Sequence, residues 1–314
     1  MIERTELLAR VASMYYEDSV TQDEIARRID TSRSTVSRML QEALDSGLVE
    51  IIVHYPWKTV PLLQADLASR FDLRESRVLL GRNRGPEEII RGLGVLAARY
   101  LDSLVAKDTI LGISWGKAVH STVRALRPAM KLPITVVQIV GSVGGGDPLT
   151  DGHELARVLA GVYGGEYRYL HAPLIVEDAR TREALMRERR IVETLTLARR
   201  AHVALVGIGA PSPRASSLLR AGYLNREVLT HMRAQGAVGN VCARHFDAQG
   251  RVLDIELNQR VVGIDLEALH SIDHVIGVAA GKAKAAAILG ALRGGHVNVL
   301  VTDDETARTV LGQA

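Results

Sequence analysis

The sequence predicts an α/β protein in which a small, mostly helical N-terminal domain precedes a larger domain built on a mostly parallel sheet. At 314 residues the chain is about twice as long as an average domain. Its beginning reads as helices and one short strand, whereas apolar strands alternate with amphipathic helices over the rest of the chain. We therefore expect two domains, residues 1–56 and residues 57–314.

The composition is that of an ordinary globular protein. Hydrophobic residues make up 47% and charged residues 24%, which excludes collagen-like, coiled-coil and disordered chains. No apolar run reaches about 18 residues, so we expect no membrane span and no membrane partner. The single cysteine, Cys242, permits neither an intrachain disulfide nor a thiolate metal cage. The opening residues MIERTELLAR lack the pattern of a signal peptide, so we expect a cytoplasmic protein.

Three helices and a strand are predicted in the first domain. The helices cover residues 3–17, 21–28 and 33–46, and the strand covers residues 48–54. The segment Thr21-Gln-Asp-Glu24 is a capping box that opens the second helix. A short break at residues 29–32 separates it from the third helix, which Gly47 ends. Two helices joined by such a break and followed by a strand indicate a winged helix-turn-helix.

The third helix has the side chains that a DNA-reading helix needs. Its N-terminal turn combines small hydroxyl groups with two arginines that can pair with guanine in the major groove. The predicted DNA contacts are Thr21, Gln22, Ser32, Arg33, Ser34, Thr35, Ser37 and Arg38. Val36 and Leu40 lie on another face and would pack against Ile25 and Ala26.

The charge of the first domain is the main argument against DNA binding. Residues 1–56 carry six arginines, no lysine and ten acidic residues, whereas DNA-binding domains usually show a basic face. The segment Thr31–Gln41 nevertheless contains two arginines and no acid, and charges within about 10 Å matter most for a phosphate contact. The alternative is a polar surface helix over Thr31–Leu44 in a small bundle. The capping box and the hydroxyl-rich helix start favour the helix-turn-helix.

In the larger domain, short apolar runs alternate with amphipathic segments. The expected strands cover residues 78–80, 110–113, 134–140, 203–208, 275–279 and 297–301. The expected helices cover residues 86–105, 116–127, 151–163, 182–199, 225–235, 281–292 and 304–312, and a connecting or oligomerising helix covers residues 62–71. Such alternation predicts a Rossmann-like, mostly parallel sheet covered by helices.

A candidate anion-binding loop follows the strand at residues 110–113. Ser114-Trp-Gly116 reads as a tight turn, and Lys117 begins a helix. Backbone amides at a helix N-terminus suit a phosphate, Gly116 permits close approach, and Lys117 adds a compact charge. The alternative from the pattern alone is an ordinary strand-to-helix turn with Lys117 in solvent.

The segment TQDEIARRIDTSRSTVSRMLQEALDSGLVEIIVHYP resembles the DNA-binding head of the SorC/DeoR-type, sugar-responsive bacterial regulators. The resemblance continues through Gly112–Gly116, Val136–Gly141, Val206–Gly209, Val261–Asp265, Ala280–Lys284 and Gly290–Gly295. It covers essentially the whole chain, and the segments follow in register. It implies that residues 57–314 share the fold of sugar-phosphate isomerases and deaminases, with an effector bound at the carboxyl edge of the sheet.

The resemblance also implies an effector pocket. Lys284 matches a lysine that relatives direct toward the ligand, whereas Lys282 would point about 200° away on a helix. Asn240 falls where some relatives carry an acidic contact. The expected effector-binding residues are Gly112, Ser114, Trp115, Gly116, Lys117, Gln138, Asn240 and Lys284. Many relatives have Thr or Ser at the position of Ala118, so an unphosphorylated polyol is an alternative to a sugar phosphate unless Ser114 or Ser121 supplies the hydroxyl.

Three further features have more than one interpretation. Gln138 lies late in an apolar strand, where its amide needs either a core partner or a ligand hydroxyl. Asp265 is expected to cap the helix at residues 266–269 rather than touch ligand. The glycine-rich segment Gly141–Pro148 fits neither phosphate fingerprint and is expected to form a loop at the pocket mouth, where Asp147 is a candidate contact.

No catalytic or metal-binding pattern is evident. His153-Glu154 lacks the second histidine of a zinc protease, Ser212 and Ser216 lack the setting of a hydrolase nucleophile, and no acid–base pair has supporting spacing. We expect no catalytic residue, no metal and no cofactor. The predicted function is a sequence-specific DNA-binding transcriptional regulator, a repressor of a carbohydrate or polyol catabolic operon that binds operator DNA as a homodimer or homotetramer and responds to a sugar phosphate or related effector. The alternative is an isomerase- or deaminase-like enzyme of sugar phosphates with an accessory N-terminal domain.

Overall fold

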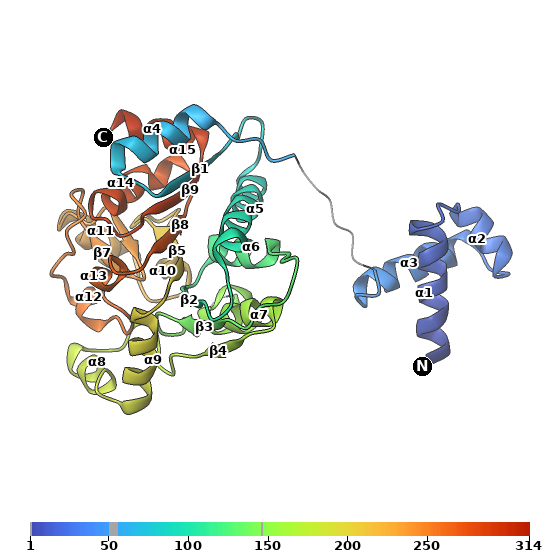
Figure 1. Ribbon diagram of the computed structural model, residues 1–314, viewed down its shortest axis with the longest axis horizontal. Helices are drawn as coiled ribbons and strands as arrows, with labels where there is room; N and C mark the ends of the chain where they lie inside the picture. Colours follow the sequence, from blue (N-terminus) through green and yellow to red (C-terminus); the bar gives the residue numbers. More distant parts are fainter. Residues whose placement is uncertain (1, 50–55, 146) are drawn as a thin grey trace. The chain divides into compact units, whose positions relative to one another are not determined.

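The computed structural model describes residues 2–49, 56–145 and 147–314. The chain divides into two compact units, Met1–Pro56 and Trp57–Ala314 (Figure 1). Most of the predicted strand at residues 48–54 falls on residues 50–55, which lie outside the described residues. The predicted wing therefore stays a prediction.

The N-terminal unit consists of three helices around a small apolar core. The helices are α1 (Ile2–Tyr16), α2 (Gln22–Arg28) and α3 (Arg33–Asp45). Thr21 and Ser32 cap α2 and α3, because each hydroxyl accepts a hydrogen bond from the amide three residues later, at 3.3 and 3.2 Å. Val36 of α3 is buried in one cluster with Ile25 and Ala26 of α2, as the sequence predicts.

The larger unit is built on a sheet with the strand order β1-β9-β8-β5-β2-β3-β4, in which all these neighbours run parallel. The strands are β1 (Glu75–Leu79), β2 (Ile110–Ile113), β3 (Thr135–Gln138), β4 (Glu166–Arg168), β5 (Val203–Gly209), β8 (His274–Val278) and β9 (Val299–Asp303). An antiparallel hairpin of β6 (Gly239–Val241) and β7 (Arg244–Phe246) continues from the end of β5. The predicted α/β class with a mostly parallel sheet is confirmed.

Helices cover both faces of this sheet (Figure 1). One face carries α5 (Pro86–Leu104), α6 (Lys117–Ala125) and α7 (Gly152–Tyr163), which share a core with alternate strand residues such as Leu111 and Leu205. The other face carries α4 (Pro61–Phe71), α9 (Arg189–Arg199), α14 (Ala285–Arg293) and α15 (Asp304–Gly312), packed on the intervening residues such as Ala204 and Val206. Burial on both faces explains why the strands read as continuous apolar runs.

The shorter elements connect these layers. They are η1 (Pro148–Thr150), α8 (Ala179–Leu185), α10 (Ser217–Arg220), α11 (Arg226–Ala234), α12 (Glu256–Arg260), α13 (Leu266–Leu269) and η2 (Lys282–Lys284). The single helix expected over residues 182–199 is wrong, since α8 ends at Leu185 and α9 begins at Arg189. The hairpin of β6 and β7 was not expected, because its turn residues Cys242 and Ala243 adopt positive φ (53° and 62°) without the usual Asn-Gly signal.

The strand order creates a crevice at β2 and β5. After β2 the chain adds β3 and β4 on one side, and after β5 it adds β8 and β9 on the other. The loops that leave the carboxyl ends of β2 and β5 therefore diverge, and open α/β sheets bind ligands at such a switch point. Within the described ranges, no helix is long and apolar enough to cross a membrane.

Candidate functional site

A pocket of about 270 Å³ opens at the carboxyl ends of β2, β5 and β8. The turn at Ser114–Gly116 and the first turn of α6 form one wall. The loop after β5 with α10 forms the second wall, the hairpin of β6 and β7 the third, and the segment from Val278 to Lys284 the fourth. The pocket therefore lies at the crevice that the strand order predicts.

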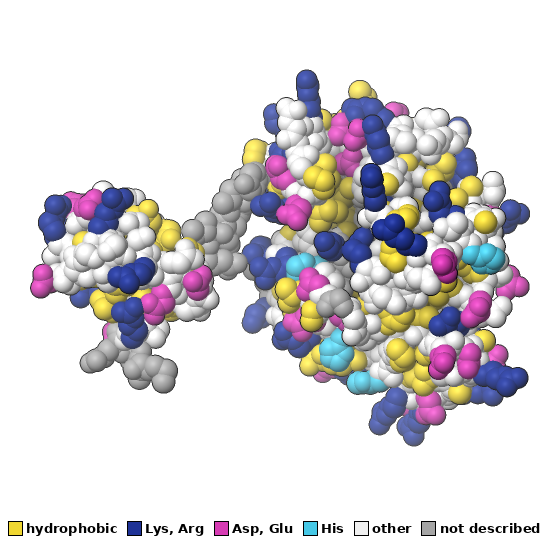
Figure 2. All heavy atoms as spheres, turned by 180° about the vertical axis from the view of Figure 1, so that it is seen from behind, with side chains coloured by type: hydrophobic (Ala, Val, Ile, Leu, Met, Phe, Trp, Pro, Cys, Tyr) yellow, Lys and Arg dark blue, Asp and Glu magenta, His cyan; other side chains and the backbone are white. Residues whose placement is uncertain are grey.

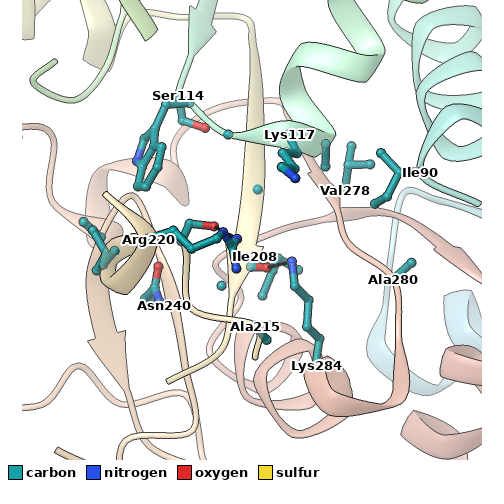
Figure 3. Close-up of a pocket in the computed structure, with 18 of the residues that line it drawn as sticks. Ile90, Ser114, Lys117, Ile208, Ala215, Arg220, Asn240, Val278, Ala280 and Lys284 are labelled. Carbon is teal, nitrogen blue, oxygen red and sulfur yellow. Dashed lines mark hydrogen bonds between the residues drawn. The ribbon is translucent and has the colours of Figure 1, made fainter. Parts of the chain in front are cut away.

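Four cationic side chains line the pocket, namely Lys117, Arg214, Arg220 and Lys284. None of the described residues that line it is Asp or Glu. Figure 3 shows the nitrogen atoms of Lys117, Arg220 and Lys284 pointing toward the same space. Like charges enclosed by protein walls raise the local positive potential, so the pocket suits an anionic ligand.

Lys284 is held inside the pocket by the end of β5. Its Nζ donates a hydrogen bond to the Ile208 carbonyl at 2.8 Å. Burial, with a smaller contribution from the positive charge of Arg220, lowers the pKa of Lys284 to about 8. Lys282 instead pairs with Glu305 at 2.7 Å on the surface, where both side chains are exposed. The two lysines therefore face different surroundings, as helical spacing predicts.

The turn after β2 contributes an unpaired hydroxyl and a helix N-terminus. Gly116 has a φ of 109°, which favours glycine, and no side chain caps α6 behind it. The Ser114 hydroxyl is buried, lines the pocket and has no hydrogen-bond partner in the described structure. An unpaired buried hydroxyl costs about 1–3 kcal/mol, so a ligand atom would be its natural partner. Ser121 is engaged elsewhere, because its hydroxyl donates to the Ile90 carbonyl at 3.0 Å.

An amide forms the uncharged side of the pocket. Asn240 lies on β6 and lines the pocket, and Trp115 lines it from the turn after β2. The Asn240 Nδ2 atom is 3.3 Å from Nε2 of His245, which is the opposite residue on β7. Gly209 of β5 leaves the space that this amide fills, since an added Cβ would lie 2.6 Å from Asn240 Nδ2.

Two expected effector residues do not line the pocket. Gly112 lies within β2, where an added Cβ would come within 2.8 Å of Ile139 Cγ2, so its lack of a side chain serves packing. Gln138 is fully buried. Its Nε2 donates to the Ser142 hydroxyl, and its Oε1 accepts from the Leu170 amide, both at 3.2 Å. For Gln138 the core partner is therefore the interpretation that the contacts favour.

Two acidic residues also differ from expectation. Asp265 precedes α13 but makes no capping hydrogen bond, so the expected cap is wrong. Its carboxylate pairs with Arg244 at 2.9 Å instead, because a guanidinium buried in the core needs an anion. Asp147 caps η1 by accepting from the Leu149 amide at 3.0 Å, and it does not line the pocket. Gly146 of the glycine-rich segment lies outside the described residues.

The sequence reasoning missed the wall formed after β5. Arg214 and Arg220 line the pocket from the loop and from α10, together with Ser217. The Arg220 guanidinium donates to the Ser217 hydroxyl at 3.1 Å and to the Arg214 carbonyl at 3.4 Å. The only signal in the sequence was a strand that ended at a Gly-Pro-Ser-rich loop with arginines, which does not distinguish a ligand wall from a solvated loop.

Six of the eight predicted DNA contacts lie at the start of α3, and Thr21 and Gln22 lie at the start of α2. All of them are exposed except Gln22 and Thr35, which are half-buried. The Thr21 and Ser32 hydroxyls are exposed and serve as caps. Arg33 lies 4.0 Å from Asp23, whereas Arg38 makes no ion pair within the described part of the chain. The face of this unit in Figure 2 carries basic and acidic side chains together, as its composition requires.

The described histidines and the single cysteine do not gather into a metal site. Among the described residues, no group of three or more His, Cys, Asp or Glu side chains could hold a metal ion. Cys242 lines the pocket but is buried, and burial raises the pKa of its thiol to about 12.

Known proteins resemble this chain over its full length. Residues 57–312 match the family described as a sugar-binding domain, and residues 6–46 match sigma-70 region 4. The chain is 31% identical over 309 residues to the deoxyribonucleoside regulator of Bacillus subtilis, covering 98% of each chain. It is 30% identical over 313 residues to the sorbitol operon regulator of Klebsiella pneumoniae, covering 97% of each. The crystal structure of full-length SorC from Klebsiella pneumoniae matches with a TM-score of 0.76 and covers 98% of each chain. These relatives are named as regulators, which supports the regulator prediction over the enzyme alternative.

Proposed function

Because this chain belongs to the SorC/DeoR-type family of sugar-binding transcriptional regulators, we propose that it represses a carbohydrate or polyol catabolic operon and that a sugar phosphate is its effector. The relatives are named for a sorbitol operon and for deoxyribonucleosides. In this proposal the protein binds double-stranded operator DNA in the cytoplasm. It does so as a homodimer or homotetramer, because one DNA-binding head offers too small an interface for strong specificity.

The charge of the pocket carries the proposal of a phosphorylated effector. The pocket combines four cationic side chains with no acidic side chain among its described lining residues. A free polyol would leave this charge uncompensated, whereas a phosphate would neutralise part of it. The Ser114 hydroxyl, which has no hydrogen-bond partner among the residues that the structure describes, would replace the hydroxyl that is missing at Ala118.

The proposed pose has two ends. The phosphate would lie at the N-terminus of α6, near Lys117 and Ser114, where the helix dipole and free amides favour an anion. Arg220 and Lys284 would contact it, or the carbohydrate oxygens next to it, from the opposite wall. The sugar would extend toward Trp115 and Asn240. Of the expected effector residues, Gly112 and Gln138 are left out, since both lie away from the pocket.

One contiguous set of contacts would carry the signal from the pocket toward the head. Ile90 of α5 lines the pocket, and its carbonyl accepts a hydrogen bond from Ser121 of α6. Two residues further along α5, an added Cβ at Gly92 would lie 2.7 Å from the ring of Trp57. Trp57 is the buried first residue of the larger unit. A ligand that shifts α6 against α5 would therefore also shift Trp57, at the boundary between the two units. A differential affinity of about 1–3 kcal/mol suffices for control.

The effector proposal is tested by thermal unfolding of the full chain with inorganic phosphate, ribose 5-phosphate, glucose 6-phosphate, fructose 6-phosphate, sorbitol 6-phosphate and the matching free sugars and sorbitol. A ligand at about 100 times its dissociation constant stabilises the folded state by about 2.7 kcal/mol. We expect the largest shift with a phosphorylated compound and its loss in Lys117→Met. Stabilisation by free sugars alone would refute the phosphate assignment.

The DNA proposal is tested by binding of the full chain to the DNA upstream of its own gene at low salt. Arg38→Ala should weaken specific binding by about 1–3 kcal/mol, and the same change at Arg33 serves as the second test. Arg10→Ala is the matched control, because Arg10 is an exposed arginine of the same unit that lies on α1 rather than on α3. Unchanged affinity in both α3 variants would remove α3 as the recognition helix.

A further inference from the structure

The uncharged wall of the pocket rests on a buried polar network behind it. His245 is 1% exposed and lies directly opposite Asn240 in the hairpin of β6 and β7. Asn258 of α12 holds the backbone of His245 on both sides, since its Oδ1 accepts from the His245 amide and its Nδ2 donates to the His245 carbonyl, each at 2.8 Å. The backbone of His245 is therefore held by a residue that does not line the pocket. The Nδ1 atom of the ring is buried and has no hydrogen-bond partner among the described residues.

The imidazole ring is neutral at physiological pH. Burial is the main influence on the pKa of His245 and lowers it to about 4. A neutral imidazole carries a hydrogen on one nitrogen and a lone pair on the other. The partner at Nε2 therefore decides which nitrogen accepts, and that partner is the Asn240 amide.

The charge of the pocket fixes the direction of this amide. Asn240 has one end against His245, with its Nδ2 at 3.3 Å from Nε2, and its other end at the pocket. An amide NH₂ group only donates, so Nε2 must carry the lone pair. The opposite orientation would aim the NH₂ group at a pocket lined by four cations, which is electrostatically unfavourable. Figure 3 shows the Asn240 oxygen directed into the pocket.

We infer that His245 is a positioning residue that accepts a hydrogen bond from Asn240 and so presents the Asn240 oxygen to the pocket as an acceptor for a ligand hydroxyl. The inference rests on the proposed function. In it, the wall formed by β6 recognises the sugar hydroxyls and not the phosphate. This position of the Asn240 amide also requires glycine at residue 209, because a Cβ added there would lie 2.6 Å from Nδ2 and 2.8 Å from Oδ1 of Asn240.

The first test needs no ligand. In the full chain with ¹⁵N-labelled histidine at pH 7, we expect the His245 ring to show a protonated Nδ1 and a bare Nε2. Its signals are assigned by their loss in His245→Gln and by their shift in Gly209→Ala, which displaces the amide. Gly207→Ala is the matched control two residues earlier on β5, since an added Cβ there meets nothing closer than 3.7 Å, and it should leave the signals unchanged. A protonated Nε2 in the wild-type chain would overturn the inference.

The second test separates hydroxyl reading from anion binding. We compare the affinities for inorganic phosphate and for the sugar phosphate of the panel that stabilises the wild-type chain most. Asn240→Leu and His245→Phe should each lower the affinity for the sugar phosphate by about 2- to 10-fold, the usual effect of one hydrogen bond. The affinity for inorganic phosphate should change by less than about 2-fold. His245→Gln should retain most of the wild-type preference for the sugar phosphate over inorganic phosphate, because the glutamine side-chain oxygen can accept the same hydrogen bond from Asn240.

The outcomes are distinct. An equal loss for both probes, or no loss for either, would overturn the role of Asn240 and His245. If no sugar phosphate stabilises the wild-type chain, the proposed effector class fails, and the ring spectrum still decides whether His245 orients Asn240.

Discussion

Removing Lys284, which is half-buried in the pocket wall, should make the protein without ligand more stable. Lys284 has a pKa of about 8 against an ordinary value of 10.5, because burial disfavours its charge. The difference corresponds to up to about 3 kcal/mol of unfavourable free energy in the folded state while the lysine is charged. Lys284→Met removes this cost and also the hydrogen bond to Ile208, which contributes about 1–2 kcal/mol. We expect a net gain of about 1–2 kcal/mol at pH 7, or roughly 2–8 °C in Tm.

The sign of the pH dependence follows from the same pKa. Below pH 8 the lysine is charged in the folded and in the unfolded chain, so its full cost is present. Between pH 8 and about 10.5 the folded chain releases the proton first, and the cost fades. The advantage of Lys284→Met over the wild type should therefore shrink as the pH rises through this window.

The assay is thermal unfolding of both chains, without ligand, at pH 7 and pH 10. Lys282→Met is the matched control. Lys282 is exposed and pairs only with exposed Glu305, so its removal should change stability by less than about 0.5 kcal/mol. A Lys284→Met chain that is less stable than wild type at pH 7, or an advantage that is the same at both pH values, would show that burial of the charge is not what sets the energy of this site.

Three further substitutions, the first with a matched control, test the fold. Gly94→Ala should destabilise the larger unit by about 1–3 kcal/mol in denaturant unfolding, because its Cβ would lie 2.6 Å from the Ser121 carbonyl oxygen, whereas Gly161→Ala, with nothing within 4 Å, should be neutral or stabilising. Asp72→Gly should stabilise by about 0.5–1 kcal/mol in the same assay, since residue 72 ends α4 with a φ of 52°. Ser32→Ala removes the cap of α3 and should speed amide hydrogen exchange in its first turn, by an amount that corresponds to about 1 kcal/mol. Unchanged exchange would mean that the cap does not hold the helix start.

Periodicity and capping chemistry were sufficient to predict most of the elements. The strand at residues 110–113 and the cap at Thr21 depend on residues close together in the chain, and the structure has them where the sequence indicates. The break between α8 and α9 was missed, because the residues around it are good helix formers.

The pocket was only partly predictable, for a different reason. Helical spacing separates Lys284 from Lys282, and a strand-turn-helix pattern identifies Lys117. Arg220 and His245 take part only because α10 and the hairpin of β6 and β7 fold back over the end of β5, and a contact of this kind leaves no local pattern. Conversely, Gln138 follows a ligand-like pattern, but its amide is satisfied inside the core.

The pocket draws its walls from four segments that lie far apart in the chain, and the central strands beneath them are packed independently on both faces. A substitution in one wall therefore changes one contact and leaves the sheet and the other walls intact. In evolutionary terms, anion capture at the start of α6 and sugar choice at the hairpin of β6 and β7 would be separate traits. A lineage could keep the anion site while the sugar-binding wall diverges, so that proteins with the same fold come to bind different carbohydrates.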